Sequence, residues 1–258
     1  MTYCVGMLVN EGLAMIADTR TNAGVDNISS YKKLHVTEVP GERVIAIATA
    51  GNLSVTQTAL AMVSEGIKMP GHDDVETLET TPSLFRAAQL VGYALNQVRQ
   101  EIAPSLTADA LKVTASMLLS GQIRGGKLGL YLIYAQGNFI ECGADTPYLQ
   151  IGELKYGKPI LDRALRPETA MADAVKLGLI SFDSTIRSNI AVGPPFDMVV
   201  IRRDSLQGEQ RRVEAEDPYF RDLGRRWSDA LEEAHRAMPA PPWMEPQANA
   251  RPAMTVVS

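Results

Sequence analysis

A threonine follows the first methionine, and its chemistry suits a nucleophile. Thr2 is small enough for Met1 to be removed during synthesis, which would leave Thr2 with a free α-amine and a hydroxyl. Such a residue carries a nucleophile and its own general base on one backbone. The reference pKa of the amine is about 7.7–8.0, close to working pH. Most chains with threonine at position 2 are not enzymes, so the hypothesis depends on the surrounding residues.

The residues that follow predict a β-hairpin that brings a carboxylate beside Thr2. A three-residue loop over 10–12 is a favoured hairpin connection, and it would place Cys4 opposite Asp18. Because side chains alternate along a strand, Thr2, Cys4 and Asp18 would then share one face. A two-residue loop would turn Asp18 to the opposite face. An Asp that ends a strand is also a common turn former, and both interpretations stay open.

A third strand is predicted over 32–37, with Lys33 pointing away from its apolar face. A lysine beside Asp18 and Thr2 would lower the pKa of the amine by like-charge repulsion. The same charge would stabilise a Thr2 alkoxide. The alternative is a solvated lysine at the edge of a sheet.

An apolar strand over 43–49 leads into Gly51 and Asn52, and Asn52 is expected to cap the following helix. Backbone N–H groups at the end of such a strand would form an oxyanion hole. The small side chain of Ala48 would let a substrate approach closely, although core packing explains a small residue equally well.

Taken together, these residues resemble the β-subunits of proteasome-type N-terminal nucleophile hydrolases. The similarity is strongest to the bacterial Anbu group, the ancestral β-subunit homologues. It covers roughly residues 2–205, and the tail that follows is also similar. The stretches that carry it are 2–9, Ala17-Asp18-Thr19-Arg20, Lys32-Lys33-Leu34, 48–52, 152–162 and Phe182-Asp183-Ser184-Thr185.

The resemblance implies a role for five positions. Thr2 would be the nucleophile, and Asp18 and Lys33 would form a charged pair beside it. The amide of Ala48 would occupy the oxyanion position, where proteasome subunits usually have glycine. Asp183 would be the supporting carboxylate near the amine of the nucleophile.

The chain departs from the proteasome pattern at two places around the amine. Gly152-Glu153-Leu154 stands where proteasomes have a Gly-Ser-Gly segment that supplies a helper serine. Ile186 stands where a second serine is expected, with Ser184 and Ser188 nearby. The hydrogen-bond partners of the amine therefore differ from those in proteasomes.

Composition limits the class of protein. The chain has 258 residues, 45% hydrophobic and 21% charged, as in ordinary globular proteins. A formal net charge of −5 argues against a nucleic-acid-binding surface. No apolar run approaches the ~20 residues of a membrane-spanning helix, and the first residues lack a signal-peptide pattern. We expect a cytoplasmic protein that binds neither nucleic acid nor membrane.

The cysteines and histidines predict neither a metal site nor a disulfide framework. Cys4 and Cys142 have no metal-ligand spacing, and the three histidines are scattered. The sequence also lacks a glycine-rich phosphate loop. No cofactor and no metal are expected, and both cysteines are interpreted as small core residues.

The hydrophobic pattern predicts a layered α+β domain, because two helices stand between two sets of strands. The resemblance implies a four-layer αββα sandwich, in which helices flank two antiparallel sheets. The predicted strands are 3–9, 13–18, 32–37, 43–49, 111–120, 127–135, 138–143 and 196–202, and the predicted helices are 52–68, 84–102 and 168–181.

We divide the chain into a hydrolase domain over 1–215 and a helical, proline-rich extension over 216–258. In the extension, Tyr219, Leu223, Trp227 and Leu231 recur at helical spacing. This apolar stripe is too large to be left in water. It docks either on its own core or on a neighbouring subunit, and the sequence favours neither.

The leading hypothesis is a self-assembling threonine peptidase that cleaves amide bonds in peptides or proteins. One alternative is an N-terminal nucleophile amidase acting on a small conjugate. Another, of a different class, is a catalytically weak scaffold whose fold drives assembly. The resemblance implies a homo-oligomer, either a ring or an open spiral.

Overall fold

The structure is a computed structural model that describes residues 1–22, 28–102 and 114–244. Two antiparallel five-stranded sheets form its centre. The first sheet has the order β12-β1-β2-β13-β14 and the second has the order β11-β10-β9-β6-β5. The first comprises β12 (Tyr148–Gly152), β1 (Tyr3–Val9), β2 (Gly12–Asp18), β13 (Phe196–Arg202) and β14 (Gly208–Val213), and the second β11 (Phe139–Glu141), β10 (Gly129–Ile133), β9 (Ala115–Ile123), β6 (Arg43–Gly51) and β5 (Leu34–Val39).

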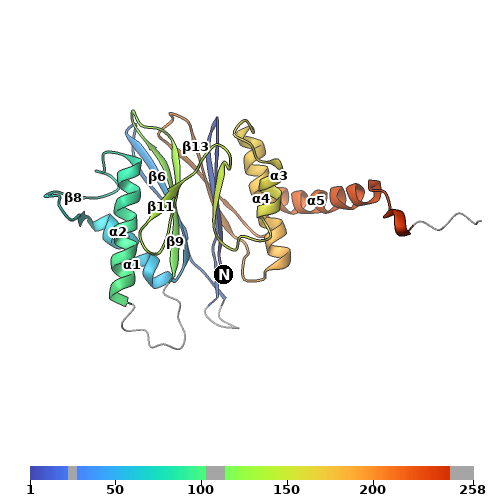
Figure 1. The fold of residues 1–258 in the computed structure, drawn as a ribbon, viewed down its shortest axis with the longest axis horizontal. Coiled ribbons are helices and arrows are strands. Elements are labelled where there is room, and N and C mark those ends of the chain that lie inside the picture. The colour runs from blue at the N-terminus through green and yellow to red at the C-terminus, as the bar shows by residue number, and fades with distance from the viewer. Residues whose placement is uncertain (23–27, 103–113, 245–258) are drawn as a thin grey trace, which may run out of the picture.

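Helices lie on the outer face of each sheet (Figure 1). The helices α1 (Leu53–Glu65) and α2 (Leu84–Ile102) share an apolar cluster with β6, β9 and β10 of the second sheet. On the other side, α3 (Lys158–Ala164) and α4 (Met171–Ser188) share a cluster with the first sheet. A third cluster, which includes Cys4, Met15 and Leu130, fills the space between the sheets. The predicted mixture of helices and antiparallel sheets is confirmed.

The most central strands are apolar on both faces, because each face meets a different cluster. In β1, Tyr3, Val5 and Met7 contact the helical side, whereas Cys4 faces the interior between the sheets. All seven residues of β2 are buried. Such strands appear in the sequence as nearly continuous apolar runs, which is why they are predicted with little error.

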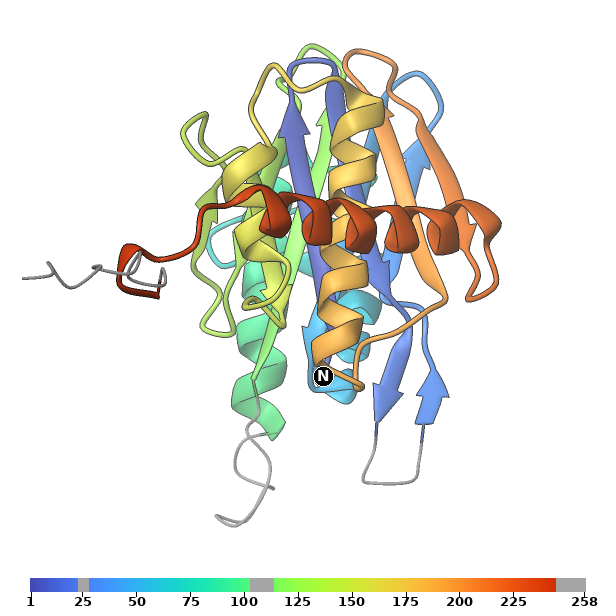
Figure 2. The same ribbon diagram turned by 90° about the vertical axis from the view of Figure 1, so that its right-hand side faces the viewer.

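The helix α5 (Pro218–Ala237) crosses the outer face of α4 (Figure 2). Asp217 caps it by accepting a hydrogen bond from the backbone N–H of Phe220 at 2.9 Å. Phe220 and Gly224 are buried against the core, whereas every residue from 229 to 244 is exposed. The first half of α5 therefore docks on its own chain, and its second half projects away from the body (Figure 1).

The hairpin between β1 and β2 has a two-residue loop, so the predicted three-residue loop is wrong. Val9 pairs with Gly12 and Cys4 pairs with Ala17. Gly12 is a strand residue, and a Cβ at this position would lie 2.4 Å from the carbonyl oxygen of Ile201. The glycine thus permits close approach of β13 and does not supply a left-handed turn.

Several elements differ from the prediction. The strands β12 and β14 and the helix α3 were not predicted, and α4 begins and ends later than 168–181. Four short strands form two further pairs: β3 (Arg20–Asn22) with β4 (Ile28–Ser30), and β7 (Ile67–Lys68) with β8 (Val75–Glu76). A short 3₁₀ helix, η2, covers Pro242–Met244. The start of the predicted strand 111–120 and the end of the tail lie outside the described residues.

A buried hydroxyl anchors β1 to its neighbours. The Tyr3 side chain has no exposed surface; its hydroxyl accepts a hydrogen bond from Gln150 Nε2 at 2.6 Å and lies 3.0 Å from Ser181 Oγ. Replacing Tyr3 with Phe leaves the Gln150 donor unsatisfied, which should lower the free energy of unfolding by about 1–3 kcal/mol. Urea denaturation measures this loss.

The control for this prediction is Tyr31→Phe, because Tyr31 is exposed. Its unfolding free energy should stay within about 0.5 kcal/mol of the wild type. Equal effects of the two substitutions would contradict a stabilising role for the buried hydroxyl.

Candidate active site

A small cavity brings together two of the sequence-predicted site residues, Thr2 and Lys33. It has a volume of about 230 Å³, and its lining includes Thr2, Thr21, Lys33, Thr49 and Gly51. These residues come from the start of β1, from β3, from the segment before β5 and from the end of β6. The cavity therefore lies where the ends of both sheets meet the start of α1.

The charged pair at this site is buried. Lys33 Nζ lies 2.8 Å from Asp18 Oδ1, with the two side chains only 4% and 0% exposed. The ammonium also donates to the carbonyl of Arg20 at 2.5 Å. Burial raises the pKa of the Asp18 carboxyl above its ordinary value, while Lys33 and the backbone N–H groups of Tyr3 and Gly193 oppose this shift.

Asp18 contacts Lys33 although the predicted pairing of β1 with β2 was wrong by one residue. With Cys4 opposite Ala17, simple alternation would place Asp18 on the face opposite Thr2. Asp18 is the last residue of β2, however, and its Oδ1 accepts a hydrogen bond from the backbone N–H of Tyr3 at 3.0 Å. The carboxylate thus bends around the end of the strand, so the predicted pair forms for a different reason.

The segment after α4 holds the end of β2 in place. The N–H of Thr19 donates to the carbonyl of Pro195 at 3.1 Å, and Arg20 Nη1 donates to the carbonyl of Ile190 at 2.8 Å. A Cβ on Gly193 would lie 2.4 Å from the Arg20 guanidinium carbon. The Arg20 carbonyl that receives Lys33 is therefore fixed by a second element.

The backbone of Thr2 is fixed by the residues that follow β12. Its carbonyl accepts a hydrogen bond from the N–H of Glu153 at 2.7 Å. Gly152 has a φ of +86°, and a Cβ there would lie 2.0 Å from that same carbonyl oxygen. In the form that carries Met1, which is 62% exposed, the Thr2 nitrogen is an amide and cannot act as a base.

The structure does not bring the Ala48 amide to the cavity. The N–H of Thr49 donates to the Lys33 carbonyl at 3.0 Å, toward β5. Neighbouring residues of a strand direct their amides to opposite sides, so the Ala48 amide points toward β9, where Ala48 pairs with Leu118. The predicted oxyanion donor is therefore part of the sheet.

Gly51 has the position that was expected for Ala48. It ends β6 with a φ of +103° and lines the cavity with Thr2. Gly51 lies on the same side of β6 as Thr49, and β5 begins only at Leu34, opposite Ala48. No β5 residue lies opposite Gly51, so the N–H of Gly51 is directed past the end of β5. A glycine directly before a helix-capping asparagine was the available sequence signal.

Asp183 also lies away from the cavity. On α4, Ser181 contacts Tyr3 of the sheet, and Asp183 is two residues, or about 200°, further around the helix. Its carboxylate pairs with Arg187 at 3.0 Å, and a Cβ on Gly224 of α5 would lie 2.4 Å from it. Asp183 thus contacts α5, and the prediction that it supports the amine does not agree with this geometry.

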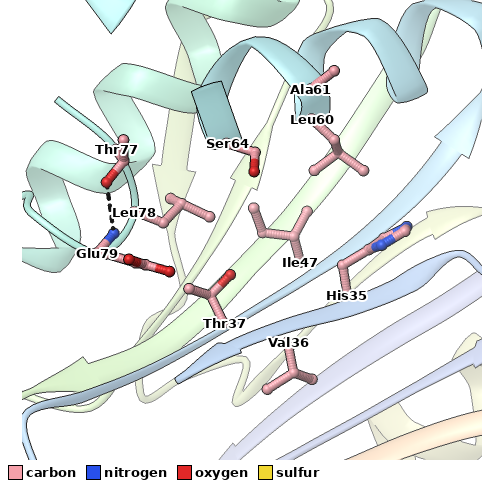
Figure 3. Close-up of a pocket in the computed structure, with 10 residues that line it drawn as sticks. All are labelled: His35, Val36, Thr37, Ile47, Leu60, Ala61, Ser64, Thr77, Leu78 and Glu79. Carbon is pink, nitrogen blue, oxygen red and sulfur yellow. Dashed lines mark hydrogen bonds between the residues drawn. The ribbon is translucent and has the colours of Figure 1, made fainter. Parts of the chain in front are cut away.

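A larger cavity of about 430 Å³ lies between β5, α1 and residues 77–79 (Figure 3). His35 and Thr37 border it from β5, and Ile47 lies on its floor. Burial and the nearby Lys32 lower the pKa of His35. None of the sequence-predicted catalytic residues lines this cavity, so it is separate from the Thr2 site.

The described residues hold no group of three or more His, Cys, Asp or Glu side chains able to bind a metal ion. Within the same residues, no helix is both long and apolar enough to span a membrane. Burial raises the pKa of the Cys4 thiol, which keeps it protonated and makes it a poor nucleophile.

Comparison with known proteins identifies close structural relatives. No family model and no curated protein matches the chain. Among solved structures, a Gly-1 mutant of Anbu from Hyphomicrobium sp. strain MC1 is 44% identical, with a TM-score of 0.85, over 93% of this chain and 99% of that one. Anbu (ancestral β-subunit) from Yersinia bercovieri is 40% identical, with a TM-score of 0.84, over 93% and 98%.

A third relative is described as the helical assembly of the Anbu complex from Pseudomonas aeruginosa. It is 42% identical, with a TM-score of 0.84, over 93% of this chain and 98% of that one. Identity at this level over nearly the whole of both chains shows the family and not only the fold. The chain belongs to the Anbu family of bacterial proteasome-like proteins.

Proposed function

We propose that this protein is a threonine-type N-terminal nucleophile hydrolase that cleaves amide bonds in peptides or proteins. The observation that carries the proposal is the shared cavity of Thr2 and Lys33, with Lys33 held by buried Asp18 at 2.8 Å. A positive charge buried beside a hydroxyl is the arrangement that activates a nucleophile. We assign the two sheets and their helices to the four-layer αββα sandwich of this class.

The chemistry requires the loss of Met1. The Thr2 hydroxyl then attacks the substrate carbonyl, and the free amine of Thr2 takes the hydroxyl proton. That proton passes to the leaving amine as the C–N bond breaks, which leaves an acyl ester on Thr2. Water, deprotonated by the same amine, hydrolyses the ester. Lys33 stabilises the developing alkoxide, and Asp18 fixes the position of Lys33.

The N–H of Gly51 is the best-placed donor for the tetrahedral oxyanion. It lies at the cavity wall, and its direction past the end of β5 leaves it facing the space beside Thr2. A Cβ at this position would lie 2.2 Å from the carbonyl of Thr114, so the backbone fits only with glycine. Backbone donors of this kind typically contribute about 10²–10³ in rate.

The cavity fits part of a peptide rather than a whole small molecule. Its volume of about 230 Å³ is below the roughly 300–1,000 Å³ of sites that enclose drug-sized ligands. One side chain and the scissile amide would enter, while the rest of the substrate lies outside. Hydrolysis of short amide conjugates, but not of peptides, would instead support the amidase alternative.

We also propose that the chain forms a homo-oligomer through its exposed arm, the segment from the second half of α5 to Met244. Leu231, Met238 and Trp243 are all exposed, Trp243 to 82%. Exposed apolar residues gathered on one projecting segment usually mark a contact surface. The described assembly of the Pseudomonas relative supports this reading, and it is equally compatible with a scaffold that has little activity.

The mechanism predicts that the mature protein begins at Thr2. Met1 is exposed and therefore accessible to an aminopeptidase. Intact-mass analysis of protein from the native host should show the loss of one methionine. Complete retention of Met1 would contradict the mechanism, because the Thr2 amide nitrogen has no free base.

Replacing the buried ion pair should slow the acylation of Thr2 strongly. The variant carries both Asp18→Asn and Lys33→Met, because removing Lys33 alone leaves a buried charge that costs about 3–5 kcal/mol. Reaction with an epoxyketone or β-lactone, followed by mass spectrometry, should slow at least about 100-fold. Circular dichroism checks that the double variant is folded.

Lys32→Ala is the matched control for the ion-pair variant, because Lys32 is the adjacent lysine and is exposed. Its acylation rate should remain close to that of the wild type. Equal losses in the two variants would mean that Lys33 has no special role.

Truncation before Asp217 should yield smaller species in light scattering. The truncation removes the exposed arm, and burying one large apolar side chain contributes about 1.5–3 kcal/mol. Leu231→Ser with Trp243→Ser removes exposed contacts only and should have the same effect without exposing the α4 surface. Unchanged particle size in both variants would argue against a role of the arm in assembly.

A further inference from the structure

A buried carboxylate next to the site has no positive partner. Glu153 is 6% exposed. Its Oε2 accepts from Asn189 Nδ2 at 2.9 Å and its Oε1 accepts from the backbone N–H of Lys155 at 3.1 Å. Both donors are neutral, and no ion pair with Glu153 occurs among residues 1–22, 28–102 and 114–244. Burying a carboxylate without a cation is unfavourable.

Glu153 is in direct contact with the residue that would carry the amine. Its backbone N–H donates to the Thr2 carbonyl at 2.7 Å, and Tyr3 pairs with Gly152 in the sheet. While Met1 is attached, the Thr2 nitrogen is an uncharged amide. Removal of Met1 turns this nitrogen into an ammonium, on the same residue whose carbonyl accepts the Glu153 N–H.

We propose that Glu153 is a positioning residue whose carboxylate accepts a hydrogen bond from the Thr2 ammonium formed when Met1 is removed. This inference rests on the proposed removal of Met1. The carboxylate fixes the position of the Thr2 amine and favours the protonated form of that amine. Loss of the negative charge should therefore lower the pKa of the amine.

The other charged groups around Thr2 do not replace this interaction. Lys33 and Asp18 pair with each other, and α1 contributes no charged side chain to the cavity lining. The Arg20 guanidinium donates to a backbone carbonyl of the segment after α4, and α4 itself is capped by neutral Asn189. Lys33 opposes protonation of the amine, so Glu153 is the group that would favour it.

A purely structural role for Glu153 is the competing explanation. In that case the side chain only ties the residues after β12 to Asn189 at the end of α4. Glu153→Gln separates the two roles, because glutamine keeps the shape and can still accept the Asn189 hydrogen bond but carries no charge. A structural role leaves the pKa of the amine unchanged.

The test measures the pKa of the amine directly. Proteins that begin at Thr2 are released from a cleavable N-terminal fusion, and their α-amine is carbamylated with cyanate over a range of pH. Mass spectrometry of the N-terminal peptide gives the rate at each pH. Glu153→Gln should lower the midpoint by about one pH unit or more. An unchanged or higher midpoint would overturn the proposal.

Glu168→Gln is the matched control, because Glu168 is an exposed glutamate. Its midpoint should equal that of the wild type. A lower pKa of the amine leaves more of it as free base at a given pH. Any acylation of Thr2 should therefore reach its plateau at a lower pH in Glu153→Gln than in the wild type.

A second measurement needs no variant of Glu153. Wild-type protein that begins at Thr2 should have a higher Tm at pH 7 than wild-type protein that retains Met1, because its buried carboxylate has gained a cation. Met1 is largely exposed, so its own packing contributes little to the comparison. An equal or lower Tm would overturn the proposal.

Neither measurement depends on catalysis. A protein whose amine midpoint responds to Glu153 but whose Thr2 is never acylated would contradict the proposed hydrolase and leave this inference intact. A protein that is acylated normally, but whose amine midpoint does not respond to Glu153→Gln, would support the proposed hydrolase and contradict this inference.

Discussion

The buried ion pair of Lys33 and Asp18 is the constraint on which the end of the molecule near Thr2 depends. Two charges with almost no exposure persist only if each is paired and hydrogen-bonded. The Tyr3 N–H donates to Oδ1 of the carboxylate, and the Arg20 carbonyl accepts a hydrogen bond from the ammonium. β1, β2 and the segment before β5 must therefore meet at one point. Since well-packed apolar residues of similar volume are often no less stable than a buried ion pair, stability alone does not explain why Lys33 and Asp18 stand there.

Patterns of apolar residues predicted the parts of the fold that are buried on both faces. The bounds of the strands β1, β2 and β6 were predicted to within a few residues, because long apolar runs leave little choice of element type, although they did not fix the β1–β2 register. β14 was missed because its residues 209–212 are charged or polar and exposed, so its strand character comes only from pairing with β13. Gly12 misled the prediction for a related reason: the sequence shows a glycine, but not whether it serves a turn or a close approach.

In the candidate site, too, some features could be predicted from the sequence and others could not. Thr2, Asp18 and Lys33 were predicted because their side chains carry the chemistry. A backbone donor depends instead on which way an amide points, and one residue of register decides this. That is why Gly51 rather than Ala48 lies at the cavity. Asp183 was placed by resemblance alone, and the helical phase set by Ser181 turns it toward α5.

The charges around Thr2 explain why removal of Met1 would matter beyond exposing a base. Lys33 and Asp18 cancel each other, whereas Glu153 has only neutral partners among the described residues. With Met1 attached, the α-ammonium is on an exposed residue, and no ion pair joins it to Glu153 in the described residues. Removal of Met1 moves the ammonium one residue inward, to Thr2, where we propose that it comes under two opposing influences, Lys33 lowering its pKa and Glu153 raising it. The base strength of the amine then depends on the balance between two fixed charges, set by the fold before any substrate binds.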